Sequence, residues 1–411
     1  MRSAIFLLAV TTALAACDAN PTGPSAGGSD QGAASSSIPE TTPDPLAAHD
    51  PGASGQPAPS SQPEAEIADP EARPVMQMQV VLDRLGFTPG VVDGKQGQST
   101  RNALLGFQQA RGLKPGGTLD SATGQALAQW RDIPATRVVT IPDEFAAGPF
   151  YAVPRNAADQ AKMPGLNYAS LDEKLAERFH TTVDTLKALN PGGVPAGAPA
   201  PSSAPSATPT ATPSTPAPAS DAHFAPQPGP PSFFHARQQI RVPNVGGDAI
   251  RPGAVDNPDW QRTLAALGVG SEQPKAKRIV VSKSKGTLQA FNEAGDLIGV
   301  YTATMGSSHD PLPLGRWTVK GVARNPPFHY NPKLFWDASP GQKKQTLPPG
   351  PNGPVGVVWI DLDKAHYGIH GTPEPQTIGR AESHGCVRLT NWDAARLAQM
   401  VSPGTQVLFE S

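Results

Sequence analysis

The stretch that decides the fold of this chain lies near its C-terminal end and reads Ser383-His384-Gly385-Cys386-Val387-Arg388-Leu389. A second short run precedes it and reads Ile369-His370-Gly371-Thr372. Together the two runs place one cysteine among two histidines. An imidazole that takes the proton of a neighbouring thiol leaves a thiolate nucleophile, so this pattern indicates acyl transfer by a cysteine.

The amino terminus predicts export and a lipid anchor. Residues 1–16 combine the basic Arg2 with an apolar stretch that is too short for a settled transmembrane helix. The run Leu14-Ala15-Ala16-Cys17 resembles the lipobox of bacterial lipoproteins, which implies removal of residues 1–16 and lipidation of Cys17. An ordinary secretory signal is the alternative. We therefore expect a periplasmic protein, anchored by lipid to the inner or the outer membrane.

The cysteine count sharpens this expectation. The chain has two cysteines, and if Cys17 is lipidated, Cys386 is the one thiol left in an oxidising compartment. It then lacks a partner for an intramolecular disulfide, which favours a reactive role. A metal site built from Cys386, His370 and His384 is disfavoured because a fourth ligand and regular spacing are missing. The sequence predicts neither a metal nor an organic cofactor.

Composition divides the chain into ordered modules and connecting segments. With 33 basic and 35 acidic residues, the charge is nearly balanced, so nucleic acid is not an expected partner. The 48 prolines cluster outside the periodic segments. Residues 17–72 are predicted to form a disordered tether, residues 191–232 a disordered insertion rich in Pro, Ala, Ser and Thr, and residues 246–275 a linker.

Residues 73–132 show helical periodicity in three short segments. Gly86 is expected to end the first helix, Thr100 to cap the second and Ser121 to cap the third. Several runs in this segment resemble the three-helix peptidoglycan-binding domain, namely Leu85-Gly86-Phe87, Asp93-Gly94, Phe107-Gln108, Gly112-Leu113 and Leu119-Asp120. The resemblance implies that peptidoglycan is a partner.

Residues 150–245 contain a second, interrupted module. Ser170 and Thr182 are expected to cap two helices, and Gln239–Asn244 has the composition of a short strand. Tyr168 to Pro191, rejoined to Ile240-Arg241-Val242-Pro243, resembles a LysM-type βααβ motif that residues 191–232 interrupt. This resemblance implies glycan binding; a helical hairpin that merely spaces two domains is the open alternative.

Residues 276–411 form the last predicted domain. Five short segments rich in β-forming residues, one helix capped by Asn391 and a final strand predict a mainly β sandwich or barrel. The expected strands are Arg278–Ser282, Thr287–Phe291, Ile298–Thr304, Arg316–Lys320, Val358–Leu362 and Thr405–Phe409. The whole chain is therefore expected to be a multidomain α and β protein.

The motifs of this last domain resemble those of the YkuD-type L,D-transpeptidases, in particular the Gram-negative periplasmic branch. They are Asn325-Pro326, the run from Leu347 to Gly356, the run from Tyr367 to Thr372, Ile378-Gly379 and the run from Ser383 to Leu389. The resemblance implies that Cys386 is the nucleophile and His370 its base. The carbonyl of Gly371 would orient the imidazole.

The resemblance also implies roles for the neighbouring residues. Backbone N–H groups of Gly385 and Cys386 are candidates for an oxyanion hole. His384 supports the site or contacts substrate, and a hydrogen-bonded scaffold histidine is the open alternative. Arg388 is expected to hold a substrate carboxylate or to anchor its loop, and Ser383 to contact substrate.

A proline-rich, aromatic segment, residues 326–356, is long and irregular enough to serve as a lid. It carries Tyr330 and Trp336, which we expect to line the groove for the stem peptide. A surface excursion packed by its own aromatic side chains is the alternative.

The reaction implied is a two-step transfer. Cys386 attacks the bond between meso-diaminopimelate and D-alanine of a tetrapeptide stem, D-alanine leaves, and an amine or water resolves the thioester. A second stem, a lipoprotein lysine or water are the alternative acceptors, and carbapenems are expected to acylate the same thiol. The competing hypothesis is a catalytically inactive lipoprotein that tethers membrane to peptidoglycan; the retained Cys386, His370 and His384 favour the enzyme.

Overall fold

The computed structural model describes residues 67–411 except 200–223, 247–249, 252, 337 and 382. The predicted signal segment, Cys17 and most of the predicted tether lie outside the described residues. Within the described part of the chain, no helix has the length and apolar character needed to cross a membrane.

The first domain consists of three helices, as predicted: α1 (Pro74–Arg84), α2 (Gln98–Ala110) and α3 (Ser121–Leu127). A 3-10 turn, η1 (Ala128–Trp130), follows α3. Two predicted caps are wrong. Thr100 lies inside α2, where its hydroxyl accepts a hydrogen bond from Gln79 Nε2 at 3.1 Å. Asp120, and not Ser121, caps α3, because its carboxylate accepts the N–H of Thr123 at 2.8 Å.

The second module contains the two predicted helices and the predicted second strand, but its first strand lies before residue 150, where the module was predicted to begin. It comprises β1 (Thr136–Thr140), α6 (Leu171–Arg178), α7 (Val183–Leu189) and β2 (Gln239–Pro243), and β1 pairs antiparallel with β2. Ser170 and Thr182 cap the two helices as predicted. We call these four elements with their connections, residues 136–243, the βααβ unit. Its LysM-type identity stays a prediction.

Shorter elements connect these parts of the βααβ unit. One-turn helices α4 (Asp143–Ala146) and α5 (Ala157–Gln160) lie between β1 and α6, and the 3-10 turn η2 (Pro191–Gly193) follows α7. The strand that precedes the two helices, β1, lies before residue 150. Met76 and Val80 of α1 share one apolar core with Leu175 and Phe179 of the βααβ unit, so the helical domain and this unit are packed together.

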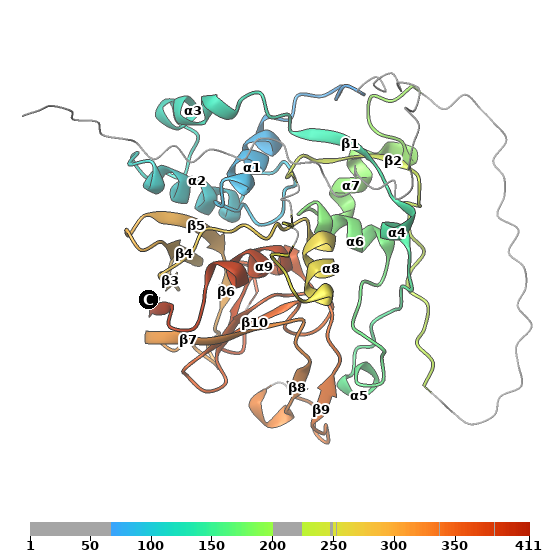
Figure 1. Cartoon of the computed structure of the whole chain (residues 1–411), viewed down its shortest axis with the longest axis vertical. Coiled ribbons are helices and arrows are strands. Elements are labelled where there is room, and N and C mark those ends of the chain that lie inside the picture. The colour runs from blue at the N-terminus through green and yellow to red at the C-terminus, as the bar shows by residue number, and fades with distance from the viewer. Residues whose placement is uncertain (1–66, 200–223, 247–249, 252, 337, 382) are drawn as a thin grey trace, which may run out of the picture. The chain divides into compact units, whose positions relative to one another are not determined.

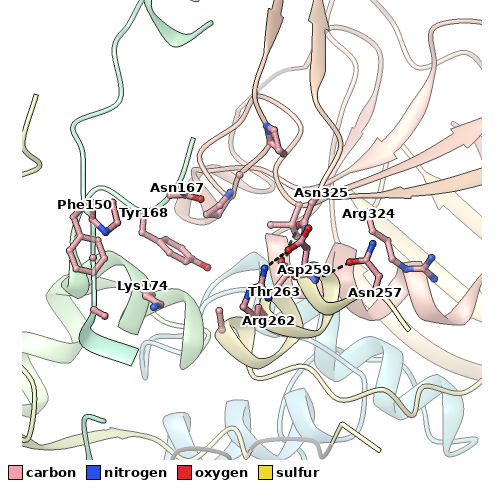
Figure 2. A pocket seen from close by; sticks show the side chains of 18 residues that line it. Phe150, Asn167, Tyr168, Lys174, Asn257, Asp259, Arg262, Thr263, Arg324 and Asn325 are labelled. Atoms are coloured by element: carbon pink, nitrogen blue, oxygen red, sulfur yellow. Dashed lines mark hydrogen bonds and ion pairs between the residues drawn. The ribbon is translucent and has the colours of Figure 1, made fainter. Parts of the chain in front are cut away.

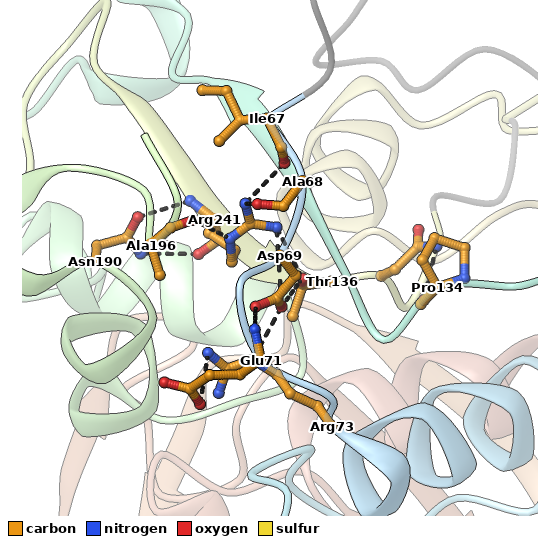
Figure 3. Close-up of polar contacts among 11 residues, drawn as sticks. Ile67, Ala68, Asp69, Glu71, Arg73, Pro134, Thr136, Asn190, Ala196 and Arg241 are labelled. Carbon is orange, nitrogen blue, oxygen red and sulfur yellow. Dashed lines mark hydrogen bonds and ion pairs between the residues drawn. The ribbon is translucent and has the colours of Figure 1, made fainter. Parts of the chain in front are cut away.

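The side chain of Arg241 in β2 holds the end of the predicted tether in place (Figure 3). Its guanidinium is buried and donates hydrogen bonds to the carbonyls of Ile67 at 2.8 Å and Ala68 at 3.0 Å, and to the hydroxyl of Thr136 at 3.0 Å. A buried guanidinium is stabilised only when acceptors surround its N–H groups. Residues 67–72 are therefore ordered against the βααβ unit, although composition alone predicts disorder for them.

Part of the predicted linker is also ordered. Helix α8 (Pro258–Leu267) begins at an Asn257 cap, and its Trp260, Leu264 and Leu267 side chains are buried in the core of the following domain. This helix therefore belongs to the body of the C-terminal domain.

The C-terminal domain is built on one nine-stranded sheet in the order β5-β4-β3-β13-β7-β10-β11-β12-β6. The two edge strands, β5 and β6, are separated along the chain by Ala303 alone, so the sheet curls until its edges approach each other. This nearly closed sheet confirms the predicted mainly β fold (Figure 1). Its strands are β3 (Arg278–Ser282), β4 (Thr287–Phe291), β5 (Leu297–Thr302), β6 (Thr304–Met305), β7 (Gly315–Arg324), β10 (Val358–Leu362), β11 (Gly368–His370), β12 (Val387–Arg388) and β13 (Gln406–Glu410).

The predicted late helix is α9 (Asn391–Met400), and its apolar face, with Trp392 and Leu397, fills the core of the sheet. Thr390 is its cap, one residue before the predicted Asn391, because the Thr390 hydroxyl accepts the N–H of Asp393 at 3.1 Å. The lid segment holds a small hairpin of β8 (Phe328–Tyr330) and β9 (Gln345–Leu347), with the 3-10 turn η3 (Pro332–Leu334) between the two strands. A last 3-10 turn, η4 (Pro375–Thr377), lies between β11 and β12.

Buried polar side chains join all three modules. Arg396 of α9 donates two hydrogen bonds of 3.0 Å to the carboxylate of Asp83 in α1, which also lies 3.1 Å from His180 Nδ1 of the βααβ unit. Burial by itself would raise the pKa of Asp83, but the charge of Arg396 and the contact with His180 lower it below its usual range. The carboxylate of Asp83 is therefore ionised and depends on Arg396.

Replacing Arg396 with methionine should destabilise the protein by about 3–5 kcal/mol, because removal of one partner leaves a buried charge uncompensated. Denaturant unfolding followed by tryptophan fluorescence measures the loss. The double variant Asp83→Asn with Arg396→Met should recover part of the stability, since it buries no unpaired charge. Equal stability of the single variant and the unmodified protein would contradict this account of the contact.

Candidate active site

Neighbouring strands place Cys386 and His370 on the same face of the sheet. Strands β11 and β12 run parallel, with Ile369 opposite Val387 and His370 opposite Arg388. Because side chains alternate between the faces of a strand, Ile369 and Val387 point into the core, where both are buried. His370, Arg388 and Cys386, which immediately precedes β12, therefore share the opposite face of the sheet.

The imidazole of His370 is held in one tautomer. Its Nδ1 lies 2.7 Å from the carbonyl oxygen of Gly371, as the sequence predicts. A carbonyl only accepts, so Nδ1 carries the proton and Nε2 keeps its lone pair. The ring also stacks on Trp359 of β10, with centroids 5.5 Å apart. This histidine is therefore fixed as a proton acceptor at Nε2.

Both reacting groups are neutral at rest. Burial, reinforced by the positive charge of Arg388, lowers the pKa of His370 to about 4. Burial raises the pKa of the Cys386 thiol above its ordinary value, although a backbone hydrogen bond from Gly368 and the charge of Arg388 oppose this rise. Because both the thiol and the imidazole are neutral, a proton transfer between them must accompany the attack of the sulfur, and no standing thiolate–imidazolium pair is needed.

The loop before Cys386 is fixed by Ser383, which is buried. The hydroxyl of Ser383 accepts the N–H of Gly306 at 2.6 Å and donates to the carbonyl of Cys386 at 2.7 Å. This geometry gives Ser383 a positioning role, and the substrate contact predicted for it stays a prediction.

Position 385 requires a glycine because of its backbone conformation and because the Tyr367 ring lies close to it. Its φ is +87°, and a Cβ at this position would lie 2.7 Å from Cε1 of Tyr367. A side chain at residue 385 would therefore strain the turn and collide with the Tyr367 ring. The oxyanion role expected of the N–H groups of Gly385 and Cys386 stays a prediction.

His384 and the lid aromatic residues lie together. The ring of His384 packs against Phe335 at 5.0 Å and Trp336 at 5.7 Å between centroids. Trp336 is 55% exposed and also stacks on His309. Tyr330 contacts Phe335 at 5.3 Å and its hydroxyl donates to Gln342, so it lies one ring further from His384. The lid segment thus meets the cysteine motif at His384.

Two residues near the site were given no catalytic or positioning role by the sequence. The ring of Tyr367 lies against Gly385. The sequence offers one signal for Tyr367, which is its place at the start of the motif that runs from Tyr367 to Thr372. Asn391, predicted only as a cap, packs its side chain against Gly371, where an added Cβ would overlap Asn391 Oδ1. Nothing in the local sequence distinguishes Asn391 from an ordinary helix-capping residue.

A cavity of about 590 Å³, shown in Figure 2, is lined by residues that include neither Cys386 nor His370. Its walls come from the βααβ unit, from α8, from the end of β7 and from the lid segment. They include Phe150, Tyr168, Lys174, Arg262, Arg324 and Pro351. Among the residues that the structure describes, no group of three His, Cys, Asp or Glu side chains is arranged to hold a metal ion.

Comparison with known families agrees with this geometry. The YkuD family model, described as an L,D-transpeptidase catalytic domain, matches residues 276–408, and the model described as "Putative peptidoglycan binding domain" matches residues 71–127. The protein named "Putative L,D-transpeptidase YkuD" of Bacillus licheniformis is 52% identical over 177 residues, which cover 43% of this chain and 87% of the relative.

Two further similarities are more distant. "Probable L,D-transpeptidase YbiS" of Escherichia coli is 29% identical over 191 residues, which cover 44% of this chain and 60% of the relative. Among solved structures, L,D-transpeptidase 3 from Mycobacterium tuberculosis is 18% identical with a TM-score of 0.28, covering 43% of this chain and 75% of that chain.

Proposed function

This chain belongs to the YkuD family of L,D-transpeptidases, and from that premise we propose how its own residues carry out the transfer. The thiol of Cys386 is the nucleophile and Nε2 of His370 the base. The observation that carries this assignment is the 2.7 Å contact between His370 Nδ1 and the Gly371 carbonyl, which directs the free lone pair of Nε2 away from Gly371.

The first step forms a thioester. The Cys386 sulfur attacks the carbonyl carbon at the L-centre of meso-diaminopimelate while its proton passes to His370 Nε2. The C–N bond to D-alanine then breaks, and His370 returns the proton to the departing amine. Because the pKa of His370 is lowered to about 4, its protonated form is a strong acid and gives this proton up readily.

The second step releases the enzyme. An amine attacks the thioester carbonyl, His370 accepts a proton from that amine, and the proton returns to the sulfur as the C–S bond breaks. We propose a second peptidoglycan stem as the principal acceptor, because the helical domain that precedes the catalytic domain matches a peptidoglycan-binding family. A lipoprotein lysine and water are the competing acceptors.

Product analysis distinguishes these outcomes. The soluble protein lacking residues 1–17 is incubated with disaccharide-tetrapeptide, and the products are separated and weighed. Release of D-alanine with formation of a 3→3 linked dimer supports the proposal. Release of D-alanine without a dimer assigns the carboxypeptidase activity, and absence of both favours the tethering hypothesis.

We further propose that the protein works in the periplasm, held to a membrane by lipid on Cys17, with the βααβ unit contacting glycan. The run Leu14-Ala15-Ala16-Cys17 supports the anchor. Intact mass of the protein extracted from membranes tests it, because an acylated N-terminal cysteine adds the mass of its lipids and a cleaved secretory signal does not.

A further inference from the structure

A buried carboxyl group of the βααβ unit contacts Asn391, the side chain that packs against Gly371 next to His370. Glu177 of α6 is buried, and Asn391 Nδ2 donates to its two carboxyl oxygens at 2.9 and 3.2 Å. The hydroxyl of Tyr168, whose ring lines the cavity of Figure 2, donates to the same carboxyl at 3.1 Å. Glu177 and Asn391 are 214 residues apart in the sequence and belong to different modules.

Asn391 in turn fixes the backbone around Gly371. Its Oδ1 accepts the N–H of Val357 at 3.3 Å, and its Nδ2 also donates to the carbonyl of Pro351 at 3.1 Å. A Cβ at Gly356 or at Gly371 would overlap Asn391 Oδ1, so the side-chain amide of Asn391 packs tightly against both glycines. The peptide of Gly371 therefore has little room to move while Asn391 keeps its orientation.

The Gly371 carbonyl is the group that sets the His370 tautomer. We propose that Glu177 is a positioning residue for catalysis: by fixing the Asn391 amide from the βααβ unit, it holds the Gly371 carbonyl where His370 needs it. The module that precedes the catalytic domain thus completes the catalytic geometry, in addition to any binding of the wall. This inference rests on the proposed roles of Cys386 and His370.

The same module holds the base of the lid segment. Leu166 exchanges backbone hydrogen bonds with it, donating to the Pro349 carbonyl at 2.9 Å and accepting the N–H of Asn352 at 2.9 Å. A Cβ at Gly350 would overlap the Leu166 carbonyl. Pro351, whose carbonyl accepts from the Asn391 amide, lies between Pro349 and Asn352. The βααβ unit therefore positions two acceptors of that amide, Glu177 directly and Pro351 through Leu166.

The carboxyl group suits this task without a permanent charge. Burial raises the pKa of Glu177 to about 8, so the group keeps its proton over much of the neutral range. In the protonated form each carboxyl oxygen keeps a lone pair, so one still accepts from Asn391 Nδ2 and the other from the Tyr168 hydroxyl. A glutamine has the same shape and keeps an oxygen acceptor for Asn391, so it should replace Glu177 with little loss.

Three variants of the protein lacking residues 1–17 test the inference. Glu177→Met keeps the volume and removes the acceptor, and Glu177→Gln keeps the acceptor. Asn102→Ala is the matched control, because Asn102 Nδ2 donates a buried hydrogen bond of 3.1 Å to Thr302 Oγ1 and so joins two modules through residues other than Asn391 and Gly371. The acylation of Cys386 by imipenem is followed by stopped-flow, and thermal melting verifies that each variant is folded.

We expect Glu177→Met to lower the limiting acylation rate constant roughly 10- to 100-fold, since small misplacements of a catalytic group have effects of this order. The fraction of enzyme acylated at the end and the concentration for half-saturation should stay unchanged. Glu177→Gln should stay within about twofold of the unmodified rate, and Asn102→Ala should match it. A loss of folded protein would instead lower the acylated fraction at an unchanged rate constant.

Three results would overturn the inference: an unchanged rate constant in Glu177→Met, an equal loss in Glu177→Gln, or an equal loss in Asn102→Ala. If Glu177→Met does not fold, the Glu177→Gln and Asn102→Ala pair is supplemented by Tyr168→Phe. That variant removes one restraint on Glu177 and should lower the rate constant severalfold, and an unchanged rate would contradict the inference. If the unmodified protein is not acylated at all, the proposed function fails, which is a distinct outcome.

Discussion

Replacing Cys386 with alanine should abolish acylation of the protein by a carbapenem and by a tetrapeptide stem. Alanine has no nucleophilic atom, and removal of a catalytic nucleophile lowers rates by roughly 10⁴-fold or more. Intact-protein mass spectrometry after incubation with imipenem measures the effect: the unmodified protein should gain one adduct, and the variant none. An adduct of unchanged yield in the variant would contradict the assignment of the nucleophile.

The loss must be separated from unfolding. The Cys386 sulfur lies 3.8 Å from the His366 carbonyl oxygen and accepts a backbone hydrogen bond from Gly368. The loop is held by the Ser383 hydroxyl through the carbonyl of residue 386, which alanine keeps. The melting temperature of the Cys386→Ala variant should therefore stay within a few degrees of the unmodified protein. A large fall in melting temperature would show that the thiol itself stabilises the loop.

Replacing His370 with asparagine should lower the acylation rate roughly 10²- to 10⁴-fold near pH 7, the range expected for loss of a positioned general base. Asparagine still offers an N–H toward the Gly371 carbonyl but has no basic nitrogen. The pKa of His370 is lowered to about 4, so the unmodified protein keeps its base neutral throughout pH 5–8. Its rate should depend little on pH in that window and fall as pH drops through about 4.

The variant should behave differently with pH. Without His370 the reaction depends on the thiolate fraction, and burial raises the thiol pKa, so the rate should rise about tenfold per pH unit up to that raised pKa. Acylation rates from pH 5 to 9 for both proteins provide the comparison. Equal pH profiles, or a bell-shaped profile centred near pH 7 in the unmodified protein, would contradict a neutral resting pair.

The elements that depend on local patterns could be predicted from the sequence. Alternating or helical periodicity gave the three helices of the first domain, α6 and α7, and most strands of the final sheet. The predicted caps Ser121 and Asn391 lie one residue too late, because Asp120 and Thr390 offer an equally suitable side chain one position earlier. The nearly closed sheet and the order of its strands depend on long-range pairing, which periodicity does not report.

The candidate site was predicted to the extent that it is encoded in short motifs. The pairing of His370 Nδ1 with the Gly371 carbonyl follows from adjacent residues, and the structure has it. The buried hydroxyl of Ser383 and the contact of Gly385 with Tyr367 depend on how loops fold back, so the sequence does not predict them. The substrate contact of Ser383 and the oxyanion-hole role of Gly385 stay predictions. The contact between Glu177 and Asn391 spans 214 residues and two modules, and no local pattern indicates it.

The measurement that tests the central claim most directly is the location of the acyl group during turnover. The unmodified protein is mixed with a tetrapeptide stem ending in meso-diaminopimelate and D-alanine, quenched in acid within the first turnover, digested and analysed by mass spectrometry. The account predicts a tripeptide thioester on the peptide that contains Cys386, formed in step with one equivalent of released D-alanine. Release of D-alanine with Cys386 unmodified throughout would contradict it.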